Sequence, residues 1–576
     1  MALFDDQGPP ASSGGPRPGS PALRRKAVGH ITHHAWTATL ARLGRLARVG
    51  VATLAALLSV HAHAAAPGIT GKVFNLTAQE ARITQPDGTS VYSWGYGCAA
   101  TSATPLVFSP STITGATCPT MQIPGPTLIV RQGDIITVTL TNNLPAAAGN
   151  TSMLFPGFVV CTGTLSPDGK TCTGTSGVAG LLAQEAQHGA TVTYTFVAAT
   201  PGTHTYYSGT QGDLQIEMGL YGAIIVLPNT AANTAGCMAL PDSGRPFGQR
   251  DFRNAVAAFD NSAACYDREY LFQFSEMDPR IHQQAEQQVA ANTSCTKPTG
   301  CMTVETEPYH PAYFMVNGRS MPDDMDPNYA PQYPHQPYNG NPHMHPGELV
   351  LLRIIGTGRW QHPFHEHGNH VRVLARDGNL LLSPVDPSHP ANPRLPAGPL
   401  LFTTTTTPGT TLDGIFYWTG KGLNWDVYAH YPGDGSVCVP DANGYYTTAS
   451  NPPAPRSAPN YYEWCQDHGK ALEKAPFGKV ASGGPVTLPD SNILTNGFWY
   501  GGSPYLGPDA TVRATAPTGT SPPSNTILNP PATEAGFAFM WHSHNEREIT
   551  TNNIFPGGMM MMMLVDPPVF PIDESN

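Results

Sequence analysis

Residues that break helices and form turns are spread through the whole sequence. Of its 576 residues, 59 are glycine and 58 are proline, while only 12% carry a charge. A chain with so many turn formers favours short strands joined by loops over long helices. No segment repeats its apolar residues with helical spacing over a length that would predict a helix. The sequence therefore predicts an all-β fold with long loops.

Alternation of polar and apolar residues identifies strands in both halves of the chain. Thr alternates with Val and Leu over 135–143, and 191–196 repeats the pattern. Successive side chains of a strand point to opposite faces, so each segment has one solvent-exposed face and one buried face. A loop-rich connection follows, and strand patterns resume at 269–274. We predict an N-terminal β domain at 68–230, a linker at 231–268, and a C-terminal β region at 269–567 that comprises one or two domains.

The N-terminus has the order of features of an export signal. Three arginines, the last of them Arg48, precede an apolar stretch at 49–60 and then small residues at Ala62 and Ala64. Signal peptides carry a basic segment, an apolar segment and a small-residue cleavage site in this order. We predict that 1–64 is an export signal and leader, cleaved after about Ala64. The mature protein would then be periplasmic or secreted.

The net charge and the hydropathy of the chain argue against two classes of partner, nucleic acids and membranes. The net charge of −11 argues against nucleic acid, which calls for a basic face. No apolar run reaches the roughly 18–20 residues that a membrane helix needs, so we expect no stable membrane span. Oligomeric state cannot be predicted from the sequence.

Ten cysteines in an exported chain indicate disulfides. None of them lies beside a cluster of histidines, so we predict that all ten are structural. We expect five bonds between neighbours in the sequence: Cys98–Cys118, Cys161–Cys172, Cys237–Cys265, Cys295–Cys301 and Cys438–Cys465.

Two His-x-His motifs on predicted strands carry the chemistry of this chain. His365 and His367 share one strand face, and His542 and His544 share one face of another strand. If the two strands are neighbours, four imidazoles converge on one point. Imidazole is the commonest protein ligand for transition metals, so these motifs predict a metal site.

The phrases around these motifs resemble those of the multicopper oxidases. His-Pro-Phe-His-Glu-His-Gly at 362–368 resembles the family's HPxHxHG motif, and Trp-His-Ser-His at 541–544 stands where the family has HCH. The segments 125–134 and 219–222 resemble the opening and the closing strand of its first domain. The resemblance implies two or three cupredoxin-like Greek-key β-sandwich domains. It also implies copper as the cofactor, with another transition metal as the alternative.

This chain departs from the family pattern in its first domain. Leu154 and Pro156 stand where the first copper motif of the family has histidines. Tyr207 and Gly209 stand where the second copper motif has histidines. Four of the eight histidines of the family's trinuclear copper cluster are therefore missing. The four that remain are His365, His367, His542 and His544.

The blue copper site of the family is altered as well. Such a site needs two histidines and a thiolate. His362 is retained, but Ser543 replaces the cysteine, and Glu548 occupies the place of the second histidine. A serine hydroxyl cannot replace a copper thiolate, so we predict no blue copper.

The remaining residues leave three interpretations open. One metal can be held by the four histidines of the two motifs, with His370 in reserve, which suits copper or zinc. Alternatively, His362 with Glu548 or Glu546 can form a histidine–carboxylate site, which favours iron, manganese or non-blue copper. In the third interpretation the histidines are packed by hydrogen bonds and hold no metal.

Two further segments offer soft metal ligands. Five consecutive methionines at 559–563 suggest either a copper relay or core packing, and we favour packing because methionine fills irregular cores well. The loop at 321–346, which ends in His-Met-His, is either a surface connection or a loading site for soft metal.

Three functions remain in competition. The first is an exported copper-dependent oxidoreductase that oxidises a small molecule, such as a phenol, or a metal ion with O2. The second is a non-catalytic periplasmic or cell-surface metal-binding protein. The third is a mononuclear oxidase at the His362 and Glu548 face. Catalytic residues cannot be assigned from the sequence, because function resides in the site rather than in the fold.

Overall fold

The structure is a computed structural model. The residues that it describes are 66–100, 105–111, 113–229, 237, 257–261, 264–390, 394–421, 438–455, 458, 460–466, 502–505, 514–515, 527–528, 536–566 and 572. The predicted export signal at 1–64 and most of the predicted linker at 231–268 lie outside these residues.

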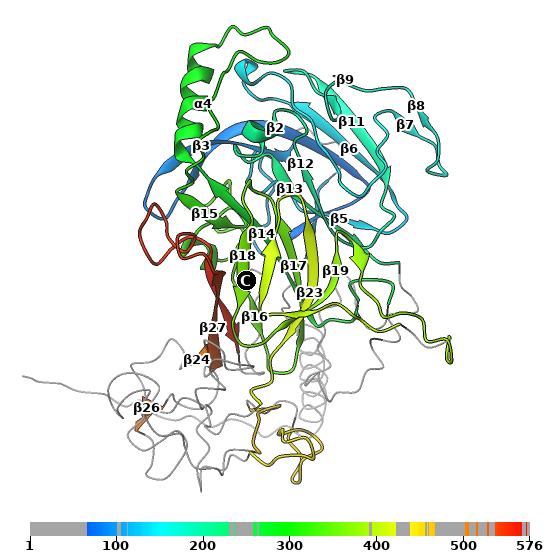
Figure 1. Cartoon of the computed structure of the whole chain (residues 1–576), viewed down its shortest axis with the longest axis vertical. Coiled ribbons are helices and arrows are strands. Elements are labelled where there is room, and N and C mark those ends of the chain that lie inside the picture. Colours follow the sequence, from blue (N-terminus) through cyan, green and yellow to red (C-terminus); the bar gives the residue numbers. More distant parts are fainter. Residues whose placement is uncertain are drawn as a thin grey trace, which may run out of the picture. The chain divides into compact units, whose positions relative to one another are not determined.

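The N-terminal half forms a β-sandwich, drawn from blue to cyan in Figure 1. One sheet has the order β12 (Gly202–Tyr207), β13 (Tyr221–Leu227), β5 (Leu128–Arg131), β1 (Gly68–Thr70), β4 (Val107–Ser109). The other has the order β11 (Thr191–Val197), β6 (Ile135–Asn142), β2 (Val73–Thr84), β3 (Ser90–Cys98). The short elements are η1 (Ala146–Ala148), β7 (Thr164–Leu165), β8 (Cys172–Thr173), β9 (Val178–Ala179), β10 (Gln184–Glu185) and α2 (Gly212–Gln215).

The predicted alternation holds in this sandwich. Strands β6 and β11 pair antiparallel, from Thr191 opposite Thr141 to Val197 opposite Ile135. Along β6 every second residue is buried, so its Val and Leu face the core and its Thr residues face outward. The buried side chains of both sheets form one core cluster that includes Trp94.

The C-terminal half forms a second sandwich. One sheet has the order β15 (Tyr313–Val316), β14 (Arg268–Met277), β17 (Leu349–Gly356), β23 (Thr411–Tyr417), β19 (Val371–Arg376), β20 (Asn379–Leu380), with β21 (Leu400–Leu401) beside β19. The other has the order β16 (His343–Met344), β28 (Met560–Val565), β27 (Gly536–Ser543), β18 (His362–Glu366), β22 (Thr403–Thr406), with β24 (Gly502–Tyr505) beside β27. The remaining elements are η3 (Asp323–Met325), β25 (Ala514–Thr515) and β26 (Ile527–Leu528).

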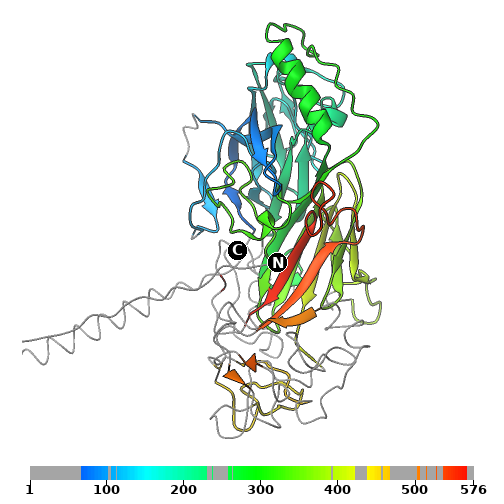
Figure 2. The ribbon, with the colours of Figure 1, turned by 90° about the vertical axis from the view of Figure 1, so that its left-hand side faces the viewer.

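The strands of the two His-x-His motifs are neighbours. Figure 2 shows the orange and red C-terminal strands running beside green and yellow strands from much earlier in the chain. Strands β18 and β27 pair antiparallel, with His365 opposite His542 and Glu366 opposite Trp541. Directly opposed residues of an antiparallel pair point to the same face of the sheet. The pairing therefore places the histidines of both motifs on one face and Trp541 on the other.

The methionine run divides between the two faces of β28. Met559, Met561 and Met563 are at most 1% exposed and belong to the core of the second sandwich, together with Trp541. Core packing is therefore confirmed for these three. Strand alternation points Met560 and Met562 to the opposite face.

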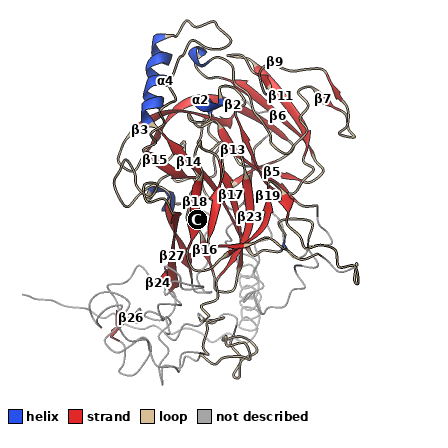
Figure 3. Ribbon diagram, in the orientation of Figure 1, coloured by secondary structure: helices blue, strands red, loops and turns tan. Residues whose placement is uncertain are grey.

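One helix departs from the all-β expectation. Helix α4 (Pro279–Ala291) packs on β3 and stands out among the strands in Figure 3. Its start has a local signal, because the side chain of Asp278 caps the backbone N–H of Arg280 and Pro279 occupies the first turn. The apolar residues Ile281 and Ala285 lie four apart and fill the N-terminal core. Two apolar residues with this spacing are too few to predict a helix from the sequence alone.

All five predicted disulfides are confirmed. The bonds join Cys98–Cys118, Cys161–Cys172, Cys237–Cys265, Cys295–Cys301 and Cys438–Cys465. Such bonds are consistent with an oxidising, extracytoplasmic compartment. Among the helices that the structure describes, none has the length and apolarity needed to cross a membrane.

Candidate metal centre

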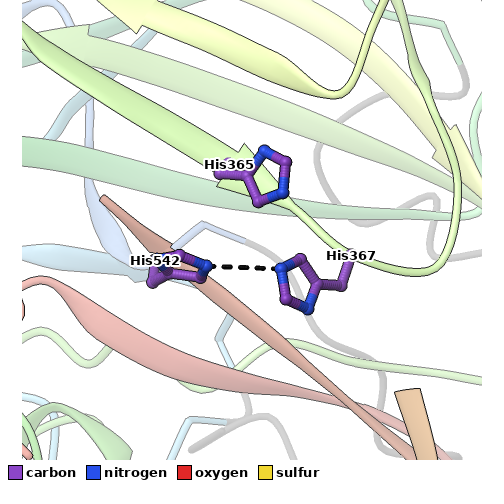
Figure 4. Close-up of side chains that lie close together, drawn as sticks. All are labelled: His365, His367 and His542. Atoms are coloured by element: carbon purple, nitrogen blue, oxygen red, sulfur yellow. Dashed lines mark hydrogen bonds between the residues drawn. The ribbon is translucent and has the colours of Figure 1, made fainter. Parts of the chain in front are cut away.

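Three histidines from the two motifs form a compact triangle. His365 lies on β18, His367 follows that strand, and His542 lies on β27 (Figure 4). One ring nitrogen of each lies within 4.8 Å of those of the other two. The Nε2 atoms of His367 and His542 are 3.3 Å apart, the dashed line of Figure 4. Two nitrogens bound to one tetrahedral metal ion stand about 3.3 Å apart, because each metal–nitrogen bond is about 2.0 Å long. The separation of these two nitrogens thus fits binding to a single ion.

The fourth histidine of the motifs lies at the edge of the triangle. The ring of His544 is 4.7 Å from that of His365, centroid to centroid. Its side chain is 51% exposed and its Nδ1 lies 3.8 Å from Glu546, which is also exposed. His370 packs against the ring of Phe402, which also contacts His365. Three histidine side chains of the site are therefore buried, and the fourth is exposed to solvent.

The imidazoles of His365 and His542 are neutral. Burial, together with the neighbouring imidazoles, lowers the pKa of His365 to about 3, and burial also lowers the pKa of His542. The Nδ1–H of His542 donates to the carbonyl oxygen of Ser543 at 2.7 Å, so its lone pair lies on Nε2, facing His367. His365 Nδ1 is hydrogen-bonded to the hydroxyl of Thr403 at 2.7 Å. Neutral imidazoles whose other nitrogen is already bound are oriented as metal ligands.

His362 lies on the opposite strand face and has different partners. Its Nε2 donates to Glu276 at 2.8 Å and its Nδ1 donates to Glu548 at 2.9 Å. Burial opposes the charge on His362, but the hydrogen bonds to Glu276 and Glu548 raise its pKa to about 9. Both ring nitrogens of this imidazolium are therefore taken by carboxylates, and no lone pair remains for a metal in this arrangement.

Ser543 completes this buried ion pair. Its hydroxyl donates to the same carboxylate of Glu548 that binds His362. Asn545 donates to the other oxygen of Glu548 at 2.9 Å. The three residues that stand in place of the family's blue copper ligands thus converge on one point, where they form a hydrogen-bonded cluster. Glu546, the other predicted carboxylate, is exposed beside His544.

Glu276 is a residue of this cluster that the sequence did not predict. This residue lies on β14 and is 3% exposed, and it accepts hydrogen bonds from the backbone N–H groups of Arg359 and Trp360. A glutamate within an apolar strand segment was the available signal. Its partner is 86 residues away in sequence, so only the packing of the two sheets identifies the pair.

The charge on His362 makes stability depend on pH. Its pKa is about 9 in the folded protein, against 6.5 for the ordinary side chain. The stabilisation is therefore complete below about pH 6.5 and is lost as the pH rises through 9. We expect the free energy of unfolding to fall by on the order of 3 kcal/mol across this window, as measured by urea denaturation.

Two substitutions test this pH dependence. The fall should largely disappear in His362→Gln. It should persist in His389→Gln, a matched control whose histidine pairs with Asp386 on the surface. A wild-type protein whose stability is flat over the window would contradict the assigned charge.

The two altered motifs of the N-terminal sandwich lie side by side. Leu154 and Tyr207 form a backbone bridge, with the N–H of Leu154 donating to the carbonyl of Tyr207 at 2.7 Å. A Cβ atom at Gly209 would stand 2.9 Å from the Leu154 side chain. Leucine thus packs where Gly209 leaves room, so the two departures from the family pattern complement each other.

The histidines at the end of the predicted loading loop bind carboxylates. His343 Nδ1 is 2.6 Å from Asp566, and His345 Nδ1 is 3.0 Å from Glu348. His343 and Met344 lie on β16, beside the end of β28. This segment is therefore part of the second sandwich, as a buried edge strand.

Comparison with known proteins supports the family resemblance. A multicopper oxidase family model matches residues 111–231. This part of the chain is therefore similar to a multicopper oxidase domain. No curated protein matches the sequence. The fold of this chain is all-β and consists of two cupredoxin-like sandwiches, as the sequence predicts.

The solved structures that match this chain are distant from it in sequence. The multicopper oxidase mgLAC is 14% identical with a TM-score of 0.39, over 87% of this chain and 88% of that one. The blue copper oxidase from Nitrosomonas europaea is 15% identical with a TM-score of 0.39, over 85% of each chain. Fet3p, a multicopper oxidase that functions in iron import, is 19% identical with a TM-score of 0.34, over 61% of this chain and 46% of that one.

Proposed function

We propose that this protein is an exported copper-binding oxidoreductase with a reduced metal site. One copper ion would be held by His365, His367 and His542, with His544 as an accessible fourth ligand. The observation that carries the proposal is the triangle of three buried imidazoles, in which the Nε2 atoms of His367 and His542 are 3.3 Å apart. Imidazole sets of this kind suit copper or zinc, and the multicopper oxidase match favours copper.

The residues around the triangle prepare it for a ligand. Thr403 orients His365, and the indole N–H of Trp541 donates to the carbonyl oxygen of His367 at 2.9 Å. Partners of this kind fix ring orientation, which supports metal affinity. The exposed His544 leaves one side of the site open to a small molecule. Copper bound there would supply one-electron exchange.

The altered blue copper position limits the reaction. His362 and Ser543 are both hydrogen-bonded to Glu548, and none of the three residues supplies a thiolate. A reducing substrate would therefore donate its electron directly at the histidine site. Small molecules such as phenols, or a metal ion, are the substrate classes that we propose. Export to the periplasm or beyond is part of the proposal and is supported by the five disulfides.

Two alternatives remain distinct from this proposal. A non-catalytic metal-binding protein would use the same triangle, and the loss of the thiolate favours it. A mononuclear oxidase at His362 and Glu548 would require His362 to release at least one carboxylate. Because both carboxylates are bound at 2.8–2.9 Å, the structure favours the triangle over this second site.

Elemental analysis and electron spin resonance of the purified mature protein test the proposal. We expect one copper per chain with a non-blue spectrum, and oxidation of a phenolic dye with O2. One bound copper without turnover on dyes or metal ions would identify the non-catalytic protein. A chain that binds neither copper nor zinc would overturn the proposal.

A further inference from the structure

A second set of soft ligands lies on the same sheet face as the histidine triangle. Strands β27 and β28 pair antiparallel, with His542 opposite Met560 and Met540 opposite Met562. Opposed residues of such a pair point to the same face. Met540 is two residues from His542 on one strand, so it shares that face as well. Three methionines therefore adjoin His542 on the outer face of this sheet.

These three side chains do not belong to the core cluster between the two sheets. Met559, Met561 and Met563 fill the interior between the two sheets, where methionine serves as a filler. By contrast, Met540 and Met562 are half-buried, and Met560 is 5% exposed. Strand positions on an outer sheet face favour β-branched or aromatic residues, which pack well on a pleated surface. Unbranched thioethers at three adjoining positions call for another explanation.

The spacing lets the three sulfur atoms meet. Side chains directly opposite each other in an antiparallel pair have Cβ atoms about 5 Å apart. A methionine side chain has three rotatable bonds, so its sulfur can turn toward a shared point. A fourth thioether lies at the edge of the group, because the backbone N–H of Met562 donates to the sulfur of Met325 at 3.4 Å.

We propose that Met540, Met560 and Met562 form a binding site for Cu(I) beside the histidine triangle. Thioether sulfur is a soft ligand that selects Cu(I) over harder divalent ions. The three side chains join the triangle through Met560, which stands opposite His542. This thioether site is inferred only from the placement of the three methionines on one sheet face. Its role as the supply of copper to the triangle rests on the proposed function.

Matched methionine variants of the full mature chain test this site. Cu(I) affinity is measured anaerobically by competition with a Cu(I)-specific chelator. The outer-face variant carries Met540→Leu, Met560→Leu and Met562→Leu. The control carries the same change on the core face, at Met559, Met561 and Met563. Methionine-to-leucine changes conserve volume and usually cost under about 1.5 kcal/mol each, and the single variants Met540→Leu and Met561→Leu repeat the comparison with less perturbation.

We expect the outer-face variant to bind Cu(I) at least about tenfold more weakly, and the core-face variant to bind like the wild type. X-ray absorption of the Cu(I)-loaded protein should show sulfur neighbours in the wild type and the control but not in the outer-face variant. An outer-face variant with wild-type affinity would overturn the site, as would equal losses in both variants.

A measurement of Cu(II) binding by the same proteins tests this site separately from the proposed function. Cu(II) binding should be retained in the outer-face variant, because the triangle is intact. If the wild type binds Cu(I) through these methionines but binds no Cu(II), the thioether site stands and the proposed histidine site fails.

Discussion

The His365→Ala variant is expected to bind Cu(II) at least about 100-fold more weakly than the wild-type protein. His365 is 1% exposed and lies opposite His542, and its ring contacts those of His367, His542 and His544. Removing its imidazole leaves two buried nitrogens, which is too few for a transition metal site. Partners in the outer shell of a metal site already contribute 10–100-fold, so a direct ligand contributes more. Competition with a Cu(II) chelator measures the loss.

Two companion variants test how the site is built. His544→Ala should lose only about tenfold in affinity, because this side chain is half exposed and less ordered by its surroundings. His370→Ala should bind copper like the wild type, since His370 packs against Phe402 rather than joining the triangle. Wild-type affinity in His365→Ala would show that the copper is held elsewhere.

The double variant Ser543→Cys with Glu548→His is expected to gain blue copper. In the wild type, Glu548 accepts hydrogen bonds both from Ser543 and from Nδ1 of His362. These three side chains therefore already converge on one point. The two substitutions turn the cluster into two histidines and a thiolate, the ligand set of a blue copper site. The copper-loaded double variant should show the intense thiolate-to-copper absorption.

The single variants and the wild type are the controls for this spectrum. Glu548→His alone has no thiolate, and Ser543→Cys alone keeps the carboxylate that binds His362, so neither should show the intense band. The copper-loaded wild type should lack it as well. An intense band in the wild type would refute the predicted loss of the blue copper site. A double variant without the band would mean that the three side chains do not meet around a metal.

The sequence by itself determined the elements with local signatures. Strand alternation predicted β6 and β11, since a strand with one buried face repeats every two residues. The local spacing of the cysteines predicted all five disulfides. The identity of residue 543 was enough to predict the loss of the thiolate, because no packing can supply sulfur to a serine.

Only the tertiary structure decided how the retained side chains are used. The sequence placed His362 and His365 three residues apart and offered both as metal ligands. The sheet pairing separates them, with His365 beside His542 and His362 between Glu276 and Glu548. The run of five methionines likewise divides into three core residues and two that lie on the same sheet face as the triangle. These outcomes depend on contacts between residues far apart in the chain, and burial and charge at such contacts are set by packing rather than by local sequence.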